Sequence, residues 1–242
     1  MRRLWMPVLL AAVLALMVPA AAEAATSAPA AQAAPAAPAV PQTLKYGQRS
    51  AAIKTLQRRL EALHYYPGAI DGHFGTNTLE AVWAFQRSQG LPGENYVNAA
   101  MQRALAHPKA PRVLNRKAGA NRIEINLSTE VLVLYQNNKI QLVSHVSTGG
   151  GYYYCSPGGG CGVARTPTGV FHTRSFYPGW LQVPLGEMYN SVFFIGTAYA
   201  IHGDTYVPLQ PASHGCVRLP MDVASFFHKL VKVPGEAVVI SR

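Results

Sequence analysis

A cysteine with histidine and arginine neighbours lies in the C-terminal part of the sequence. Cys216 stands in the segment 213–218 (SHGCVR), two residues after His214 and two before Arg218, with His202 upstream. A thiol attacks a carbonyl carbon as its thiolate, and an ordinary cysteine has a pKa of about 8.5. A neighbouring imidazolium or guanidinium lowers that pKa. The spacing therefore predicts a thiol activated for nucleophilic attack.

The surrounding residues supply the other parts of acyl transfer. A histidine can take the thiol proton, and backbone N–H groups of the turn at Gly215 and Cys216 can hold an oxyanion. Zinc is the competing interpretation, because His202, His214 and Cys216 could each be a ligand. No C-x-x-C or H-E-x-x-H pattern accompanies them, and Asp204 is the carboxylate nearby. We therefore expect no metal and, in the absence of nucleotide, flavin or haem motifs, no cofactor.

The remaining two cysteines lie close together in the sequence. Cys155 and Cys161 are separated by a proline and three consecutive glycines, which make a tight loop feasible. An exported protein can oxidise such a pair. We predict a disulfide between them, which leaves Cys216 as the unpaired thiol.

The N-terminus has the pattern of a secretory signal peptide. Arg2 and Arg3 precede an uncharged run at 4–22, and Ala22-Glu23-Ala24 fits a cleavage site with small residues on either side of any residue. An uncleaved membrane anchor is the alternative, since the run is nearly long enough to span a bilayer. We expect residues 1–24 to be removed, leaving a secreted protein with no membrane span. This removal takes away two arginines and one glutamate, so the formal net charge of +10 becomes +9. The positive charge indicates anionic polymers, carboxylate-bearing wall peptides or acidic lipid surfaces as partners, and not nucleic acid, and the alternative is that it serves only solubility and weak adsorption.

The middle of the chain changes character twice. Hydrophobic residues make up 49% of the sequence, which excludes wholesale disorder, but residues 25–42 are an Ala/Pro-rich linker that cannot bury a core. Residues 43–107 then show three short helical patterns. In the second, Asn77 followed by Glu80 predicts an N-terminal capping box.

The C-terminal half has the period of β-strands. Residues 108–120 form a basic linker, which we interpret as a solvated hinge. From 121 to 242 short apolar runs alternate with Gly and Pro clusters, Asn137-Asn138 marks a hairpin turn, and 222–231 is a late helix. The predicted fold class is α+β: a small three-helix bundle followed by a mostly β, sandwich- or barrel-like domain.

Specific motifs give this β region a family resemblance. His202-Gly203 followed by the segment 213–218 resembles the active-site signature of the bacterial L,D-transpeptidases. The segments 146–149 (VSTG) and 165–171 (RTPTGVF) are similar to two strand-end motifs of that family, and 188–194 resembles the stretch that leads into the His-Gly strand. The resemblance covers residues 121–242. The loop that contains Cys155 and Cys161 is an insertion relative to that pattern, and we interpret it as a structural loop.

The helical region resembles a second family, the three-helix peptidoglycan-binding domain. The matching segments are 56–60 (LQRRL), 68–75 (GAIDGHFG) and 81–86 (AVWAFQ). The implied partners are peptidoglycan stem peptides and the wall polymer. A degenerate spacer that binds nothing is the alternative, because a fold does not guarantee a function.

The resemblance implies a role for each site residue. Cys216 attacks the bond before the terminal D-alanine of a tetrapeptide stem, and the resulting thioester passes to an amine of a second stem, making a 3→3 cross-link. His202 is the general base and acid, oriented by a backbone carbonyl near Gly203. His214, Gly215 and Cys216 form the oxyanion site. Ser213, Gly203 and Gly215 contribute to the substrate site, and Arg218 orients the turn or meets a substrate carboxylate.

Three other functions remain open on the sequence alone. An L,D-carboxypeptidase would use the same residues with water as the acceptor. A non-catalytic peptidoglycan-binding protein would use the β domain as a wall anchor, although the complete set of site residues weighs against it. An unrelated secreted cysteine protease shares the thiol–imidazole chemistry but not the strand-end motifs.

Overall fold

The computed structural model describes residues 42–242. The predicted signal peptide, residues 1–24, lies outside this range, as does the Ala/Pro-rich linker up to residue 41. Within the described range, none of the helices is both long and apolar enough to cross a bilayer.

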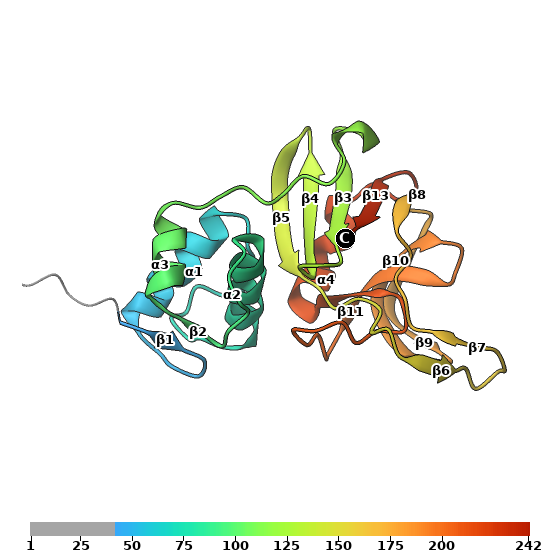
Figure 1. Ribbon diagram of the computed structural model, residues 1–242, viewed down its shortest axis with the longest axis horizontal. Coiled ribbons are helices and arrows are strands. Elements are labelled where there is room, and N and C mark those ends of the chain that lie inside the picture. Colours follow the sequence, from blue (N-terminus) through green and yellow to red (C-terminus); the bar gives the residue numbers. More distant parts are fainter. Residues whose placement is uncertain (1–41) are drawn as a thin grey trace, which may run out of the picture. The chain divides into compact units, whose positions relative to one another are not determined.

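Three helices and a two-stranded sheet form the N-terminal helical domain (Figure 1). Its elements are β1 (Leu44–Lys45), α1 (Ala51–Ala62), α2 (Thr76–Ser88), β2 (Tyr96–Val97) and α3 (Ala99–Ala106). Two of the helices begin at side-chain caps: Ile53 N–H donates to Ser50 Oγ at 3.2 Å, and Met101 N–H donates to Asn98 Oδ1 at 3.0 Å. Each cap satisfies a backbone donor that the first turn leaves unpaired.

The predicted capping box at α2 is wrong. Gly75 is the N-cap residue and makes no side-chain hydrogen bond, so Asn77 lies inside the first turn. The Asn77 side-chain amide instead donates to the Asp222 carboxylate. Glu80 is buried. The Asn77 side chain is therefore used in a tertiary contact, which overrides the local capping preference.

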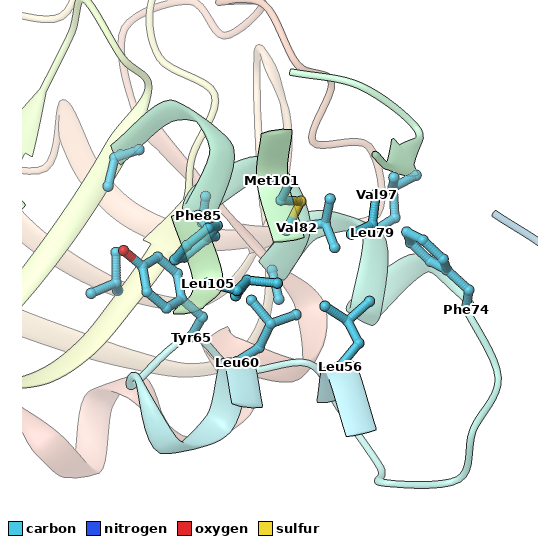
Figure 2. Close-up of a cluster of buried hydrophobic side chains, with 14 of the residues drawn as sticks. Leu56, Leu60, Tyr65, Phe74, Leu79, Val82, Phe85, Val97, Met101 and Leu105 are labelled. Carbon is cyan, nitrogen blue, oxygen red and sulfur yellow. The ribbon is translucent and has the colours of Figure 1, made fainter. Parts of the chain in front are cut away.

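One apolar cluster fills the helical domain. Figure 2 shows its side chains converging from all three helices. The labelled members are Leu56, Leu60, Tyr65, Phe74, Leu79, Val82, Phe85, Val97, Met101 and Leu105. This burial, and not helix propensity alone, stabilises helices of only two to four turns.

The β domain consists of two main sheets, a hairpin and one helix. Its elements are β3 (Arg122–Asn126), β4 (Val131–Gln136), β5 (Lys139–His145), β6 (Tyr153–Cys155), β7 (Cys161–Val163), β8 (Gly169–His172), β9 (Ser175–Val183), β10 (Gly186–Ile195), β11 (Tyr199–Asp204), β12 (Val217–Pro220), α4 (Met221–Leu230) and β13 (Ala237–Ser241).

The strand order defines the layers. One sheet has the order β5-β4-β3-β13-β8 and the other β12-β11-β10-β9, while β6 and β7 pair only with each other. In Figure 1 strands β5, β4, β3 and β13 lie side by side in that order. Neither main sheet closes into a barrel between residues 42 and 242. The predicted α+β class, with a helical region followed by a mostly β domain and a late helix, is confirmed.

The two sheets and α4 share one core. It is formed by apolar side chains from both sheets, among them Ile123, Leu134, Val192, Phe194, Ile201, Val217, Val223 and Phe227. Because Ile201 and Val217 are fully buried in it, β11 and β12 are fixed against the rest of the domain.

Strand β4 is buried on both faces. Leu132 and Leu134 belong to the core between the sheets. The alternate residues Val131, Val133 and Tyr135 belong instead to the apolar cluster of the helical domain. Strand side chains alternate in direction, so an uninterrupted apolar run is the pattern of a strand covered on both sides. The helical domain therefore packs directly on the five-stranded sheet.

The turn between β4 and β5 lies at Asn137-Asn138, where the sequence predicts it. Asn137 and Asn138 have φ angles of 52° and 61°. Two successive residues with positive φ match a two-residue type I′ hairpin turn, a type in which asparagine is favoured. The hairpin prediction is confirmed.

The segment 108–120 makes hydrogen bonds to both domains. The Gln89 side chain and the Lys109 backbone exchange two hydrogen bonds of 2.8 Å each. Farther along, Leu114 N–H and Asn115 N–H donate to the Glu124 carboxylate at 2.7 and 3.2 Å. Polar partners in both domains thus hold the linker, which the charge pattern alone did not indicate.

Candidate active site

Strands β11 and β12 bring the two key side chains to one surface. They are parallel, with Ile201 paired to Val217 in the register. Paired residues of neighbouring strands point to the same face, and successive residues alternate. Since Ile201 and Val217 point into the core, His202 and Cys216 project from the opposite face.

His202 is a buried histidine whose ring contacts a neighbouring backbone carbonyl. Its ring is 4% exposed, and Nδ1 lies 2.9 Å from Gly203 O, which can only accept, so the proton is on Nδ1 and Nε2 is an acceptor. Burial lowers the pKa of His202, against the opposing effects of Gly203 O and Asp204. Gly203 also allows close packing of α4, because a Cβ there would lie 2.7 Å from Ala224 Cβ.

Cys216 is a partly exposed free thiol. Ala200 N–H donates to its Sγ at 3.4 Å, and Sγ in turn lies 3.8 Å from Ala198 O. Burial raises the pKa of the Cys216 thiol, and the contributions of Ala200 N–H and Arg218 in the opposite direction are smaller. The expectation of a lowered thiol pKa is therefore wrong, because the sequence showed the neighbouring charges but not the loss of solvent around sulfur.

The turn before Cys216 is closed by internal hydrogen bonds. Ser213 Oγ donates to Cys216 O at 2.5 Å and accepts from Gly215 N–H at 3.0 Å. Thr166 Oγ1 donates to Gly215 O at 2.7 Å. Gly215 has a φ of 140°, a region open to glycine and strained for other residues. Since the Gly215 N–H is bonded to Ser213, Cys216 N–H and His214 are the better-placed candidates for holding an oxyanion.

Arg218 is engaged with its own loop. Its Nε lies 3.0 Å from Asp204 Oδ2, and its Nη1 donates to Tyr206 O at 3.4 Å. Of the two roles expected for Arg218, this pairing favours orienting the turn over meeting a substrate carboxylate.

His214 lies against two tyrosine rings, one just before β6 and one in β6. Tyr152 and Tyr154 approach it edge-on, with ring centroids 5.4 and 4.8 Å away. Cys155 and Cys161 form a disulfide that closes the β6–β7 hairpin. Burial and, to a smaller extent, Arg218 lower the pKa of His214 below its ordinary value. The inserted loop, interpreted from the sequence as structural, therefore contacts a predicted site residue.

A cavity of about 870 Å³ lies in front of these residues. This volume is within the range of small-molecule and peptide sites. Its polar lining includes His202, Asp204, Ser213, His214, Cys216 and Arg218. Its apolar lining comes mainly from β9 and β10 and includes Phe176, Leu181, Val183, Leu185, Met188 and Phe193.

The apolar wall was missed in the sequence. Strand β9 contains Pro178, and β10 shifts register between Tyr189 and Ser191. These interruptions hide two long strands, although Leu181 and Val183 show the alternation that could have identified β9. Within residues 42–242, no group of three or more His, Cys, Asp or Glu residues is arranged to hold a metal ion.

Comparison with known proteins divides the chain into two family matches. Residues 120–240 match the family of L,D-transpeptidase catalytic domains, and residues 49–105 match a family of peptidoglycan-binding domains. The crystal structure of an L,D-transpeptidase from Xylanimonas cellulosilytica is 30% identical, with a TM-score of 0.77 over 85% of this chain and 100% of that one.

Two further matches are more distant. The structure of an L,D-transpeptidase from Stackebrandtia nassauensis is 18% identical, with a TM-score of 0.47, and the match covers 82% of this chain and 94% of that one. The N-acetylmuramoyl-L-alanine amidase CwlM of Mycobacterium tuberculosis is 40% identical over 53 residues, which are 22% of this chain and only 13% of the amidase.

Proposed function

This chain belongs to the L,D-transpeptidase family, and from that premise we propose that Cys216 is the nucleophile of an acyl transfer between peptidoglycan stem peptides. The observation that carries the proposal is that the free thiol of Cys216, just before β12, and the buried imidazole of His202 in β11 line one cavity. The donor is a tetrapeptide stem.

The acylation step follows from the protonation states. His202 Nε2 takes the thiol proton as Cys216 Sγ attacks the carbonyl carbon before the terminal D-alanine. Cys216 N–H and His214 stabilise the oxyanion of the tetrahedral intermediate. When the intermediate collapses, the imidazolium returns the proton to the departing amine, which leaves as D-alanine, and a thioester remains.

In the second step Cys216 is the leaving group instead of the nucleophile. A side-chain amine of another stem attacks the thioester, His202 accepts the amine proton, and the thiolate leaves and is reprotonated. The product is a 3→3 cross-link. The apolar wall limits the access of water to the thioester, which favours an amine acceptor over hydrolysis.

We also propose that the protein acts outside the membrane, after export and removal of residues 1–24, and that its helical domain binds the wall. Family membership of both domains supports this location, because their implied substrate is the cell wall.

The direct test is mass spectrometry of the protein incubated with a tetrapeptide stem and a foreign D-amino acid. Exchange of the terminal D-alanine for the foreign residue is the expected result, with no exchange by Cys216→Ala. Tripeptide alone would mean hydrolysis, that is, an L,D-carboxypeptidase. No product, with binding to insoluble wall retained, would mean a binding protein. Exchange by Cys216→Ala would exclude this nucleophile.

His202→Ala tests the assignment of the base. We expect the exchange rate to fall by about 10²- to 10⁴-fold, the usual contribution of a general base. His172→Ala is the matched control, since His172 is an exposed histidine of β8 that does not line the cavity with Cys216. A small loss in His202→Ala and a larger one in His214→Ala would reverse the two histidine roles.

A further inference from the structure

The loop that leads into Cys216 is held in place by hydrogen bonds that other segments donate to its backbone carbonyl oxygens. We call residues 205–215 the catalytic loop. Four of its carbonyl oxygens accept hydrogen bonds from outside the loop at 2.9 to 3.0 Å. The donors are His145 Nε2 to Pro208 O, Arg87 Nη2 to Leu209 O, Ser147 Oγ to Gln210 O, and Gly150 N–H to Ser213 O.

One of these donors comes from the helical domain. Arg87 lies in the last turn of α2, and its Nη2 donates to Leu209 O at 2.9 Å while Nη1 donates to Thr129 O at 3.4 Å. The guanidinium therefore joins the catalytic loop to the turn before β4. A hydrogen bond from a charged donor is stronger than a neutral one, and Arg87 is half-buried, which limits competition by water.

The same part of the loop is packed as well as hydrogen-bonded. The Leu209 side chain lies against Gly93 of the helical domain, so closely that a Cβ at Gly93 would be 2.6 Å from Leu209 Cδ1. Gly93 therefore provides the space that Leu209 occupies. Two independent contacts, one polar and one apolar, place Leu209 on the helical domain.

A second path, through Glu130 and Thr148, connects Arg87 to the same loop. The buried Glu130 carboxylate, whose charge interacts with Arg87, accepts from Thr148 N–H at 2.6 Å and from Thr148 Oγ1 at 2.7 Å. Thr148 O accepts from Ser213 N–H at 2.9 Å. Ser213 in turn bonds to Cys216 O. Arg87 is thus linked to the proposed nucleophile through the loop, and also through its charge interaction with Glu130 and the hydrogen bonds that lead from Glu130 to Ser213.

We propose that Arg87 is a positioning residue for the catalytic loop, so that the helical domain contributes to turnover as well as to wall binding. The inference rests on the proposed function of Cys216. A loop displaced at Leu209 carries Ser213 and Cys216 away from His202, and misplacement of reacting groups by about 1 Å can cost about 10²-fold in rate.

The experiment compares full-length variants on a soluble tetrapeptide stem, where wall binding plays no part. In Arg87→Ala we expect kcat for D-alanine release to fall about 10- to 100-fold with KM changed less than about twofold. Arg87→Lys keeps one charged donor and should recover part of the loss. Gly93→Ala places a methyl group in the space that the Leu209 side chain occupies. It should therefore displace the loop and lower kcat in the same way.

Arg59→Ala is the matched control. Arg59 also donates to a backbone carbonyl, Leu105 O, at 2.9 and 3.0 Å, but this contact lies wholly within the helical domain. We expect its kcat to stay at the unaltered level. Unfolding temperatures identify any variant that fails to fold, and the Arg87→Lys recovery separates positioning from a general loss of stability.

The outcomes separate this inference from the proposed function. Turnover by the unaltered protein, with Arg87→Ala and Gly93→Ala both within twofold of it, would overturn the positioning role alone. A loss in Arg59→Ala equal to that in Arg87→Ala would do the same. If the unaltered protein does not turn over the stem, the proposed function fails. The positioning role is then tested by the rate at which Cys216 is alkylated. We expect this rate to differ at least twofold between Arg87→Ala and the unaltered protein, and an equal rate would overturn the positioning role.

Discussion

At the level of single residues, burial sets the protonation of the proposed nucleophile and its base. The Cys216 pKa is raised and the His202 pKa is lowered, in each case mainly by loss of solvent. Both shifts favour the neutral form, so the resting pair is thiol and imidazole, not thiolate and imidazolium. The thiol is then unreactive until a substrate carbonyl is in place, when proton transfer and attack can occur together.

Alkylation of Cys216 by iodoacetamide tests this pairing. Because the reagent reacts with the thiolate, we expect a slow rate at pH 7 that rises about tenfold per pH unit towards pH 9. His202→Ala should leave the profile unchanged, since a neutral imidazole does not stabilise the thiolate. A rate that stays high down to pH 6 in the unaltered protein and disappears in His202→Ala would indicate an ion pair instead.

At the level of elements, the β6–β7 hairpin forms part of the site. Its disulfide joins the two strands, and Tyr154 contacts His214 and lines the cavity. An edge-on aromatic contact fixes the orientation of the imidazole, which otherwise rotates about its side-chain bonds. The hairpin therefore helps to hold His214, the histidine that we propose for the oxyanion site, which lies outside regular secondary structure.

Tyr154→Ala tests the hairpin contact. Loss of an aromatic pair worth about 0.5 to 1.5 kcal/mol should lower kcat/KM about 2- to 12-fold. Tyr154→Phe keeps the ring edge and serves as the control, with kcat/KM close to that of the unaltered protein. Equal losses in the two variants would show that the hydroxyl, and not the ring contact, is what matters.

Local patterns in the sequence predicted those parts of the fold that short-range interactions determine. The Asn137-Asn138 turn and the late helix α4 follow from residue type and periodicity. The use of Asn77 at a domain contact and the double covering of β4 depend on residues far away in the sequence, so no local pattern reveals them. The raised Cys216 pKa belongs to the same group, because solvent exclusion is a property of the folded cavity.

At the level of the whole molecule, ionisable groups are buried where the helical and β domains meet. Burial raises the pKa of Glu80 to about 8 and that of Glu130 to about 7. Asp222 contributes to the shift of Glu80, and Arg87 acts against that of Glu130. Both carboxyls hold a proton in the folded protein at a pH where an unfolded chain has released it.

These shifts make stability depend on pH. A carboxyl whose folded pKa is raised contributes stability at low pH, and the contribution is lost as pH rises through the folded value. We expect the free energy of unfolding to fall between pH 6.5 and 8, by about 1 to 2 kcal/mol from Glu80 alone. Below pH 6.5 the effect is opposed by His145, whose pKa burial lowers to about 4.

Glu80→Gln measures this contribution. The free energy of unfolding is measured with urea at several pH values. Between pH 6.5 and 8 it should fall less steeply in the variant than in the unaltered protein. Glu61→Gln is the control, because Glu61 is exposed on α1 and should leave the slope unchanged. An identical decline in the unaltered protein and in Glu80→Gln would show that Glu80 is already ionised in the folded state.

The double covering of β4 has a consequence for protein engineering. Domains joined by a free tether can be exchanged between proteins, but here Val131, Val133 and Tyr135 need the helices to shield them from water. A transplanted β domain would present this apolar stripe to solvent and be prone to self-association. Chimaeras built from this chain should therefore keep the helical domain with the sheet that it covers, or replace the stripe with polar residues.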